Sequence, residues 1–179
     1  TPPCASASVV TGVGTDITTG RGTGLDDAGL ARKAEVVQRS IDVNKPDSKD
    51  GLDILMKVGG FEIGVLAGVF LGAAAGRRPV IVDGFISGAG ALVAHAMAPE
   101  ASYSFIASHQ SVEPGHRLGL SHMGLEPLLD MGMRLGEGSG AVLSMHIVEA
   151  AAKCLSDMTT FAEAGVSEKI EDDGQGTAS

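Results

Sequence analysis

The chain has 179 residues, a formal net charge of -9 at pH 7, 26 glycines, no tryptophan and 3% aromatic residues. This length suits one domain, and the acidic excess argues against nucleic acid or an anionic membrane as main partner, because phosphate groups attract clustered Lys and Arg. Apolar residues make up 44% of the chain and are mostly Ala, Val, Leu and Ile, which favours helices packed closely on a parallel sheet.

The cysteines and the apolar runs bear on the cellular compartment of the protein and on membrane insertion. Cys4 and Cys154 lie far apart without metal-ligand spacing, so free thiols in a reducing cytoplasm are expected. The chain begins at Thr1 without a charged segment leading into an apolar one, so no signal peptide is predicted. The most apolar run, residues 61–75, contains Glu62 and is shorter than the about 20 residues that span a bilayer, which predicts a buried helix.

The N-terminal part is predicted to be helical. A helical piece is expected near residues 5–12 and is followed by a loop. A glycine-rich turn, residues 20–24, comes before Asp26 and Asp27, which suit the start of a helix. The next apolar residues have the spacing of one helical face: Leu30, Ala34, Val37 and Ile41. This helix is expected to end at residues 44–47.

Two apolar runs are predicted to be neighbouring strands. Residues 77–84 start with Arg-Arg-Pro and end in Asp-Gly, and residues 103–107 lead into Ser108 and His109. A helix of about residues 88–98, capped by Ser87, is expected between them. Strand, helix and strand form a βαβ unit, whose right-handed crossover places both carboxyl ends at the edge where open α/β sheets bind ligands.

The whole pattern predicts an α/β fold, a Rossmann-like parallel sheet with flanking helices. Further helices are expected at residues 51–58, 60–76, 114–122 and 141–158, whereas the Leu- and Met-rich segment 125–135 fits no single type. One domain is predicted over residues 1–167. The acidic, glycine-rich tail, residues 168–179, is expected to be disordered.

The turn at residues 20–24 has the composition of an anion site. Its glycines let the backbone approach a phosphate, and the helix that follows supplies N–H donors and Lys33. A turn closed by a capped helix, without any ligand, is the alternative that these residues leave open.

Polar side chains follow both predicted strands. Asp83 could accept hydrogen bonds from sugar hydroxyls or could cap a turn, and Ser111 could face the same ligand. No metal site is predicted, because the spacings of His109, His116 and His122 match no zinc signature.

Glu137 lies between two glycines in the turn at residues 136–140. The preceding residues, 128–135, are too apolar for a fully exposed loop, so a partly desolvated carboxylate is expected, a state that suits a general base. Arg134 could balance its charge or grip an anionic group of a ligand. A surface loop remains the alternative.

Six blocks, in this order, resemble the nicotinate-nucleotide:dimethylbenzimidazole phosphoribosyltransferase family. They are GRGTGL at 20–25, VDGFIS at 82–87, SHQSVEPGH at 108–116, LEPLLD at 125–130, RLGEGSGA at 134–141 and MTTFAEAGV at 158–166. The resemblance spans about residues 1–168. It implies transfer of phosphoribose from nicotinate mononucleotide to dimethylbenzimidazole, which yields nicotinate and α-ribazole phosphate for the lower ligand of cobamides.

The resemblance also implies roles for single residues. Glu137 matches the glutamate that takes a proton from the benzimidazole. The resemblance implies that Gly22 and Lys33 bind the phosphate. It places Asp83 and Ser111 at the sugar or base region of the nucleotide, and Arg134 near the nicotinate carboxylate. No metal or cofactor is implied.

Members of the family are longer than this chain, and their glycine-rich segment that ends in Thr-Pro would lie just before Thr1. The resemblance therefore implies the C-terminal half of a cytoplasmic homodimer, with an incomplete sheet. The alternative is a catalytically incomplete fragment that binds nucleotide or phosphate, or that serves as an oligomerisation surface. An unrelated α/β hydrolase is disfavoured, because no Gly-x-Ser-x-Gly elbow follows a strand.

Overall fold

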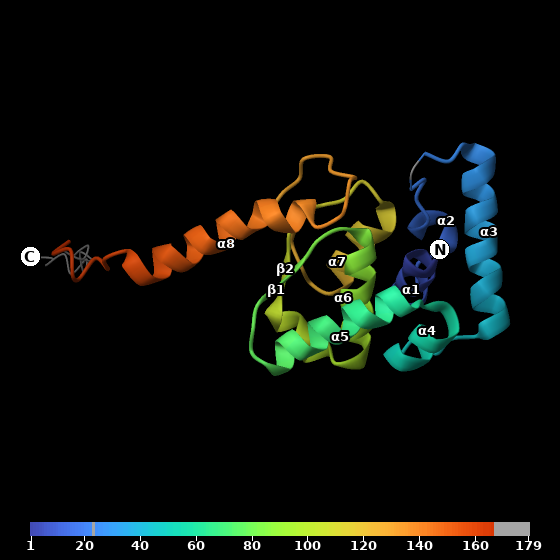
Figure 1. Cartoon of the computed structure of the whole chain (residues 1–179), viewed down its shortest axis with the longest axis horizontal. Coiled ribbons are helices and arrows are strands. Elements are labelled where there is room, and N and C mark those ends of the chain that lie inside the picture. Colours follow the sequence, from blue (N-terminus) through green and yellow to red (C-terminus); the bar gives the residue numbers. More distant parts are fainter. Residues whose placement is uncertain (23, 167–179) are drawn as a thin grey trace, which may run out of the picture. The chain divides into compact units, whose positions relative to one another are not determined.

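The structure, a computed structural model, describes residues 1–22 and 24–166. The chain divides into a first unit, Thr1–His146, and a second unit that begins at Ile147. The elements, labelled in Figure 1, are α1 (Pro2–Thr11), α2 (Thr15–Thr18), α3 (Asp27–Asn44), α4 (Gly51–Val58), α5 (Phe61–Ala75), β1 (Val80–Val82), α6 (Phe85–Met97), η1 (Pro99–Ser104), β2 (Phe105–Ala107), α7 (Pro114–His122) and α8 (Ser139–Asp157).

The N-terminal helices follow the sequence prediction with two differences. α1 begins at Pro2 rather than near residue 5, because proline fits the first turn of a helix. The short helix α2 stands where a loop was expected. The predicted cap of α3 is confirmed, since the side chain of Asp26 accepts a hydrogen bond from the Gly29 N–H at 2.8 Å.

The predicted parallel pairing is confirmed. β1 and β2 lie side by side, with Val80 opposite Phe105 and Val82 opposite Ala107, and helix α6 connects them. β2 is shorter than predicted, because the residues before Phe105 belong to the 3-10 helix η1. Both carboxyl ends therefore lie at one edge, where a ligand can reach them.

The start of α6 corrects one prediction. Ser87 does not cap this helix: α6 begins at Phe85 with Gly84 at the cap position. The hydroxyl of Ser87, on the third helical residue, instead accepts the backbone N–H of Asp83 at 2.8 Å. The chain thus enters the helix directly after β1, which holds Asp83 at the corner between strand and helix.

The Leu- and Met-rich segment 125–135 extends the hydrogen-bonded edge beyond β2. Leu128 donates its backbone N–H to the Ala107 oxygen at 3.0 Å, and Leu129 donates to the Ser108 oxygen at 3.0 Å. Gln110 donates its backbone N–H in return to the Leu129 oxygen at 2.8 Å. This strand-like pairing joins segments distant in sequence, and the pattern of apolar residues in the segment did not predict it.

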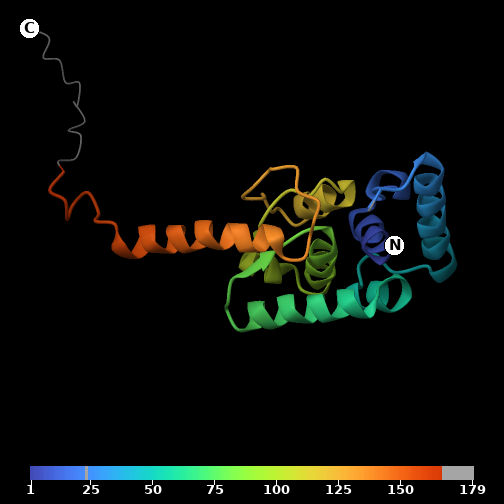
Figure 2. The ribbon, with the colours of Figure 1, turned by 45° about the horizontal axis from the view of Figure 1, so that its top comes forward.

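The core of the first unit surrounds α6. This helix packs against α5, α1, α4 and α7 (Figure 2). Its many glycine and alanine residues permit close approach. A Cβ at Gly90 would meet the side chain of Leu66 on α5. Near β2, the rings of Phe70 and Phe105 lie 5.1 Å apart, a favourable aromatic contact.

The second unit contains the C-terminal part of α8 and a hydrogen-bonded turn. In that turn Thr160 and Glu163 cap each other, since the hydroxyl of Thr160 lies 2.8 Å from the Glu163 carboxylate and accepts the Glu163 N–H. The predicted tail at residues 168–179 lies outside the described residues. Across residues 1–22 and 24–166, no helix is both long and apolar enough to cross a membrane.

Candidate active site

Asp83 organises the turn that carries Glu137. Its carboxylate accepts the backbone N–H of Gly138 at 3.0 Å and that of Ala141 at 2.9 Å. These are unpaired donors at the start of α8, where a negative charge also meets the positive end of the helix dipole. Asp83 therefore has the capping geometry that its sequence position left open, and it fixes the Glu137 turn (residues 136–140) at the sheet edge.

Glu137 itself has a left-handed backbone. Its φ of 55° lies in the same region as those of Gly136 (74°) and Gly138 (81°), and a residue with a side chain pays about 1 kcal/mol for this conformation. Such a conformation persists only where the surroundings impose it, and here the hydrogen bonds to Asp83 do so. The backbone thus directs one carboxylate out of a narrow, glycine-lined turn.

The expected partial burial of this turn is wrong for the chain described. Glu137 is exposed, and the apolar side chains before it are exposed as well: Leu128 (42%), Met131 (59%) and Leu135 (70%). The apolar segment runs along the open edge of the sheet, and no described residue covers it. The apolar segment therefore forms an exposed edge and is not part of the core.

A buried polar cluster supports the turn from below. The His109 ring, 1% exposed, lies so close to Gly140 that a Cβ there would overlap it. The Nδ1 of His109 is 3.0 Å from the Ser108 hydroxyl and 3.9 Å from Asp83 Oδ1. From α8, Ser144 donates to the Ser108 backbone oxygen at 3.1 Å. The start of α8 is thus anchored in the interior.

His116 belongs to the same interior. It is 2% exposed, and its Nδ1 accepts the backbone N–H of Ser111 at 3.1 Å. Burial, with a smaller contribution from His109, lowers the pKa of His116 to about 4, so the ring is neutral at pH 7. Among residues 1–22 and 24–166, no group of His, Cys, Asp and Glu side chains is arranged to hold a metal ion.

The second part of the site is the Gly22 turn (residues 20–22 and 24), where three of the predicted binding residues meet. Lys33 donates to the Gly20 backbone oxygen at 2.8 Å, and Arg134 donates to the Gly22 oxygen at 3.0 Å. Gly22 has a φ of 57°. Because Arg134 lies three residues before Glu137, its hydrogen bond links this turn to the segment that carries the candidate base.

Glu113 is a member of this site that sequence reasoning missed. Its carboxylate accepts the Gly22 N–H at 3.0 Å across 91 residues of sequence. From the sequence, Glu113 was only the residue directly before the predicted helix α7. Ser111 connects to it, since the Ser111 hydroxyl accepts the Glu113 N–H at 3.3 Å. Only the tertiary structure brings these side chains to Gly22.

Two buried hydroxyls border the two turns without a hydrogen-bond partner in the described part of the chain. Thr19 directly precedes the Gly22 turn, and Ser139 lies within the Glu137 turn. Buried hydroxyls are usually satisfied. Within the same described residues, the hydroxyl of Ser6 and the Nε2 of His116 also lack a partner, so this feature is not specific to the two turns.

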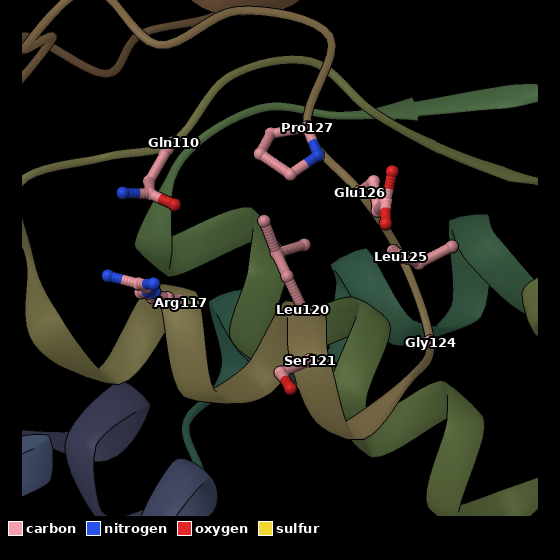
Figure 3. A pocket seen from close by; sticks show the side chains of 8 residues that line it. All are labelled: Gln110, Arg117, Leu120, Ser121, Gly124, Leu125, Glu126 and Pro127. Carbon is pink, nitrogen blue, oxygen red and sulfur yellow. The ribbon is translucent and has the colours of Figure 1, made fainter.

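A separate cavity of about 310 Å³ lies beside α7 (Figure 3). Its lining residues are Gln110, Arg117, Leu120, Ser121, Gly124, Leu125, Glu126 and Pro127. It contains none of the residues predicted for catalysis or binding. The candidate site is therefore the open edge between the Glu137 turn and the Gly22 turn, not this cavity.

Comparison with known proteins gives the class first. A family model described as a phosphoribosyltransferase matches residues 1–166, which include both turns and the parallel strands. A solved structure, that of CobT from Thermus thermophilus, superposes with a TM-score of 0.87 and 42% identity, over 94% of this chain and 50% of that one.

Curated relatives specify the family. A nicotinate-nucleotide–dimethylbenzimidazole phosphoribosyltransferase from Desulforudis audaxviator is 57% identical over 96% of this chain and 49% of its own length. A protein of the same name from Chloroflexus aurantiacus is 61% identical over 85% of this chain and 43% of its own length. The chain belongs to the nicotinate-nucleotide–dimethylbenzimidazole phosphoribosyltransferase family, as the six sequence blocks indicated.

The chain spans about half the length of the curated relatives it matches. Its sheet is correspondingly small: within the described residues two strands pair in parallel, and Leu129 adds a bridge to His109. The predicted incomplete α/β fold is thus confirmed, and the apolar edge beside Glu137 is exposed in the described part of the chain.

Proposed function

We propose that this chain forms the nucleotide-handling part of an enzyme that transfers phosphoribose from nicotinate mononucleotide to dimethylbenzimidazole. The products are nicotinate and α-ribazole phosphate. The observation that carries the proposal is the turn held by Asp83, which projects Glu137 at the sheet edge while Arg134, on the same segment, reaches the Gly22 turn. A base and an anion site are thereby placed on one surface.

In this proposal Glu137 acts on the ring N–H of dimethylbenzimidazole. Its carboxylate accepts that proton, and the freed nitrogen electron pair attacks the anomeric carbon of the ribose. The bond from that carbon to the nicotinate nitrogen breaks, and its electron pair leaves with nicotinate, so that the configuration inverts. Positioning and proton removal supply the catalysis, and the step uses no cofactor or metal.

The other residues hold the mononucleotide. Lys33 and the Gly22 N–H bind its phosphate, and Arg134 lies near the nicotinate carboxylate. Ser111 contacts the sugar or base region. Asp83 has both carboxylate oxygens engaged with backbone N–H groups, which supports a positioning role as well as the contact with the nucleotide that the family resemblance implies.

The partners and the setting are part of the same proposal. A segment matching the N-terminal half of the relatives completes the site, in the same polypeptide or in trans, and the assembled enzyme is a cytoplasmic homodimer. The exposed apolar residues Leu128, Met131 and Leu135 support a covering of this edge by protein.

The first prediction tests the base. Glu137→Gln keeps the size of the side chain but cannot accept the proton, so nicotinate release should fall at least about a hundredfold. Binding of nicotinate mononucleotide should change less than about twofold, since the carboxylate acts only on the benzimidazole proton. Nicotinate release is followed chromatographically, with the N-terminal half supplied.

Glu126→Gln is the matched control, because it removes an exposed glutamate from the separate cavity beside α7, outside the Glu137 turn. It should release nicotinate at the parental rate. Undiminished release in Glu137→Gln would remove the role given to this residue. Binding of nicotinate mononucleotide by calorimetry, with no product from any assembly of halves, would instead favour a domain that only binds nucleotide.

A further inference from the structure

The Gly22 N–H, the backbone donor proposed for the phosphate, is already engaged by an anion of the chain itself. Glu113 Oε1 lies 3.0 Å from this nitrogen. The neighbouring Gly20 is shaped to the same side chain, since a Cβ there would overlap the Glu113 carboxylate and would also meet the ring of Pro114. The turn and the carboxylate therefore fit each other closely.

The cations around this turn are not neutralised by ion pairs. Lys33 and Arg134 both donate to backbone oxygens of the turn, and neither lies within 4.0 Å of a carboxylate oxygen in the described part of the chain. Arg21, by contrast, pairs with Asp27. A turn with a left-handed glycine, a donated N–H and a nearby lysine, Lys33, unpaired among the described residues, is an anion site, and the Glu113 carboxylate is the anion bound to its N–H.

We propose that Glu113 is an internal stand-in for the phosphate of the substrate: its carboxylate occupies the Gly22 N–H in the free protein and must leave when a phosphate monoester binds. The identity of that ligand rests on the proposed function. A phosphate monoester, with a charge near −2, and a carboxylate repel each other. The Gly22 N–H therefore cannot donate to both at once. Glu113 thus lowers the affinity for phosphate while it keeps the empty turn ordered.

The local structure permits this exchange. Glu113 is half-buried at the start of α7, and its backbone is held by the hydrogen bond from its N–H to the Ser111 hydroxyl. Only the side chain needs to rotate, because the backbone anchor does not involve the carboxylate. Rotation releases the Gly22 N–H without disturbing Ser111.

The test compares phosphate binding in three proteins by calorimetry, with inorganic phosphate as the probe. Glu113→Gln removes the charge but keeps a weaker acceptor, and Glu113→Ala removes both. Affinity for phosphate should rise about threefold to tenfold in Glu113→Ala and by a smaller factor in Glu113→Gln, as expected for the loss of a partly exposed charged competitor. The Gly22 amide resonance should shift in both variants without phosphate.

Glu35→Gln is the control for overall charge, because it removes an exposed carboxylate from α3, close in sequence to Lys33. It should change phosphate affinity less than about twofold. Equal gains in this control and in Glu113→Gln, weaker phosphate binding in either Glu113 variant, or no phosphate binding in Glu113→Ala would each overturn the proposal.

The outcome separates this proposal from the function itself. If the assembled enzyme releases nicotinate but the Glu113 variants leave phosphate affinity unchanged, the stand-in role fails and the function stands. If phosphate affinity rises as described but no assembly releases nicotinate, the function fails and Glu113 remains a competitor for an anion of another origin.

Discussion

The Glu137 turn and the Gly22 turn lie at one site but are held in opposite ways. Below the first, Asp83 and the 1%-exposed His109 form an interior support that leaves no room for a Cβ at Gly140. The second is exposed from Arg21 onward and is held by long side chains from distant segments, Lys33, Glu113 and Arg134. The Glu137 turn is thus supported from the interior, whereas the Gly22 turn depends on side chains from three distant segments.

The largest effect should follow from breaking the interior support. Gly140→Ala would drive a Cβ into the His109 ring, and overpacking of this kind costs roughly 3 kcal/mol. The midpoint of urea unfolding measures the loss of stability. Gly136→Ala is the control: its φ of 74° carries a backbone penalty of about 1 kcal/mol, and a Cβ there meets no atom within 4 Å. Equal losses in the two variants would contradict the described packing of His109.

A second effect concerns pH and the same interior. The pKa of His116 falls from 6.5 to about 4 on folding, so the unfolded chain binds more protons between these values. Its contribution to stability, on the order of 3 kcal/mol, is complete above pH 6.5 and is lost as pH falls towards 4. Unfolding free energies at pH 4.5 and 7.5 measure it. His116→Gln should flatten the slope, and an unchanged slope would exclude His116 as its source.

The smallest effect on stability should come from the exposed turn. Lys33→Gln removes a cation whose hydrogen bond to Gly20 is partly solvated, so the free energy of unfolding should change by less than about 0.5 kcal/mol. Affinity for phosphate should nevertheless fall severalfold, because one charge of the anion site is gone. Val36→Ala, an exposed change on the same helix, serves as control for both measurements. A large loss of stability in Lys33→Gln would remove the contrast between the two turns.

Local signals predicted most of the architecture. The Asp26 cap, the apolar period of α3 and the two short apolar runs correctly indicated a helix and a parallel βαβ unit, because capping and hydrophobic period act within a few residues. The same signals failed at Ser87, whose hydroxyl turns back to Asp83 instead of capping α6. Side-chain partners at a strand–helix corner depend on how the chain bends there.

For the apolar segment before Glu137, the prediction from composition was wrong. Its composition suggested burial, yet Leu135 is 70% exposed. An apolar composition does not show whether residues of the same chain bury a segment. The relatives are about twice as long as this chain. Family resemblance identified the candidate base where hydrophobic pattern alone could not choose between a site and a loop.

By itself the sequence determined the family, the helices with strong caps and period, and the glycine-flanked position of Glu137, because these depend on residues close together in the chain. Only the tertiary structure decided that Asp83 caps the turn 55 residues away and that Glu113 reaches Gly22 across 91 residues. Contacts of this span leave no periodic trace, since they arise when packed elements bring distant side chains to one edge. The carboxylate of Glu137 is therefore encoded locally, and its orientation is set by the fold.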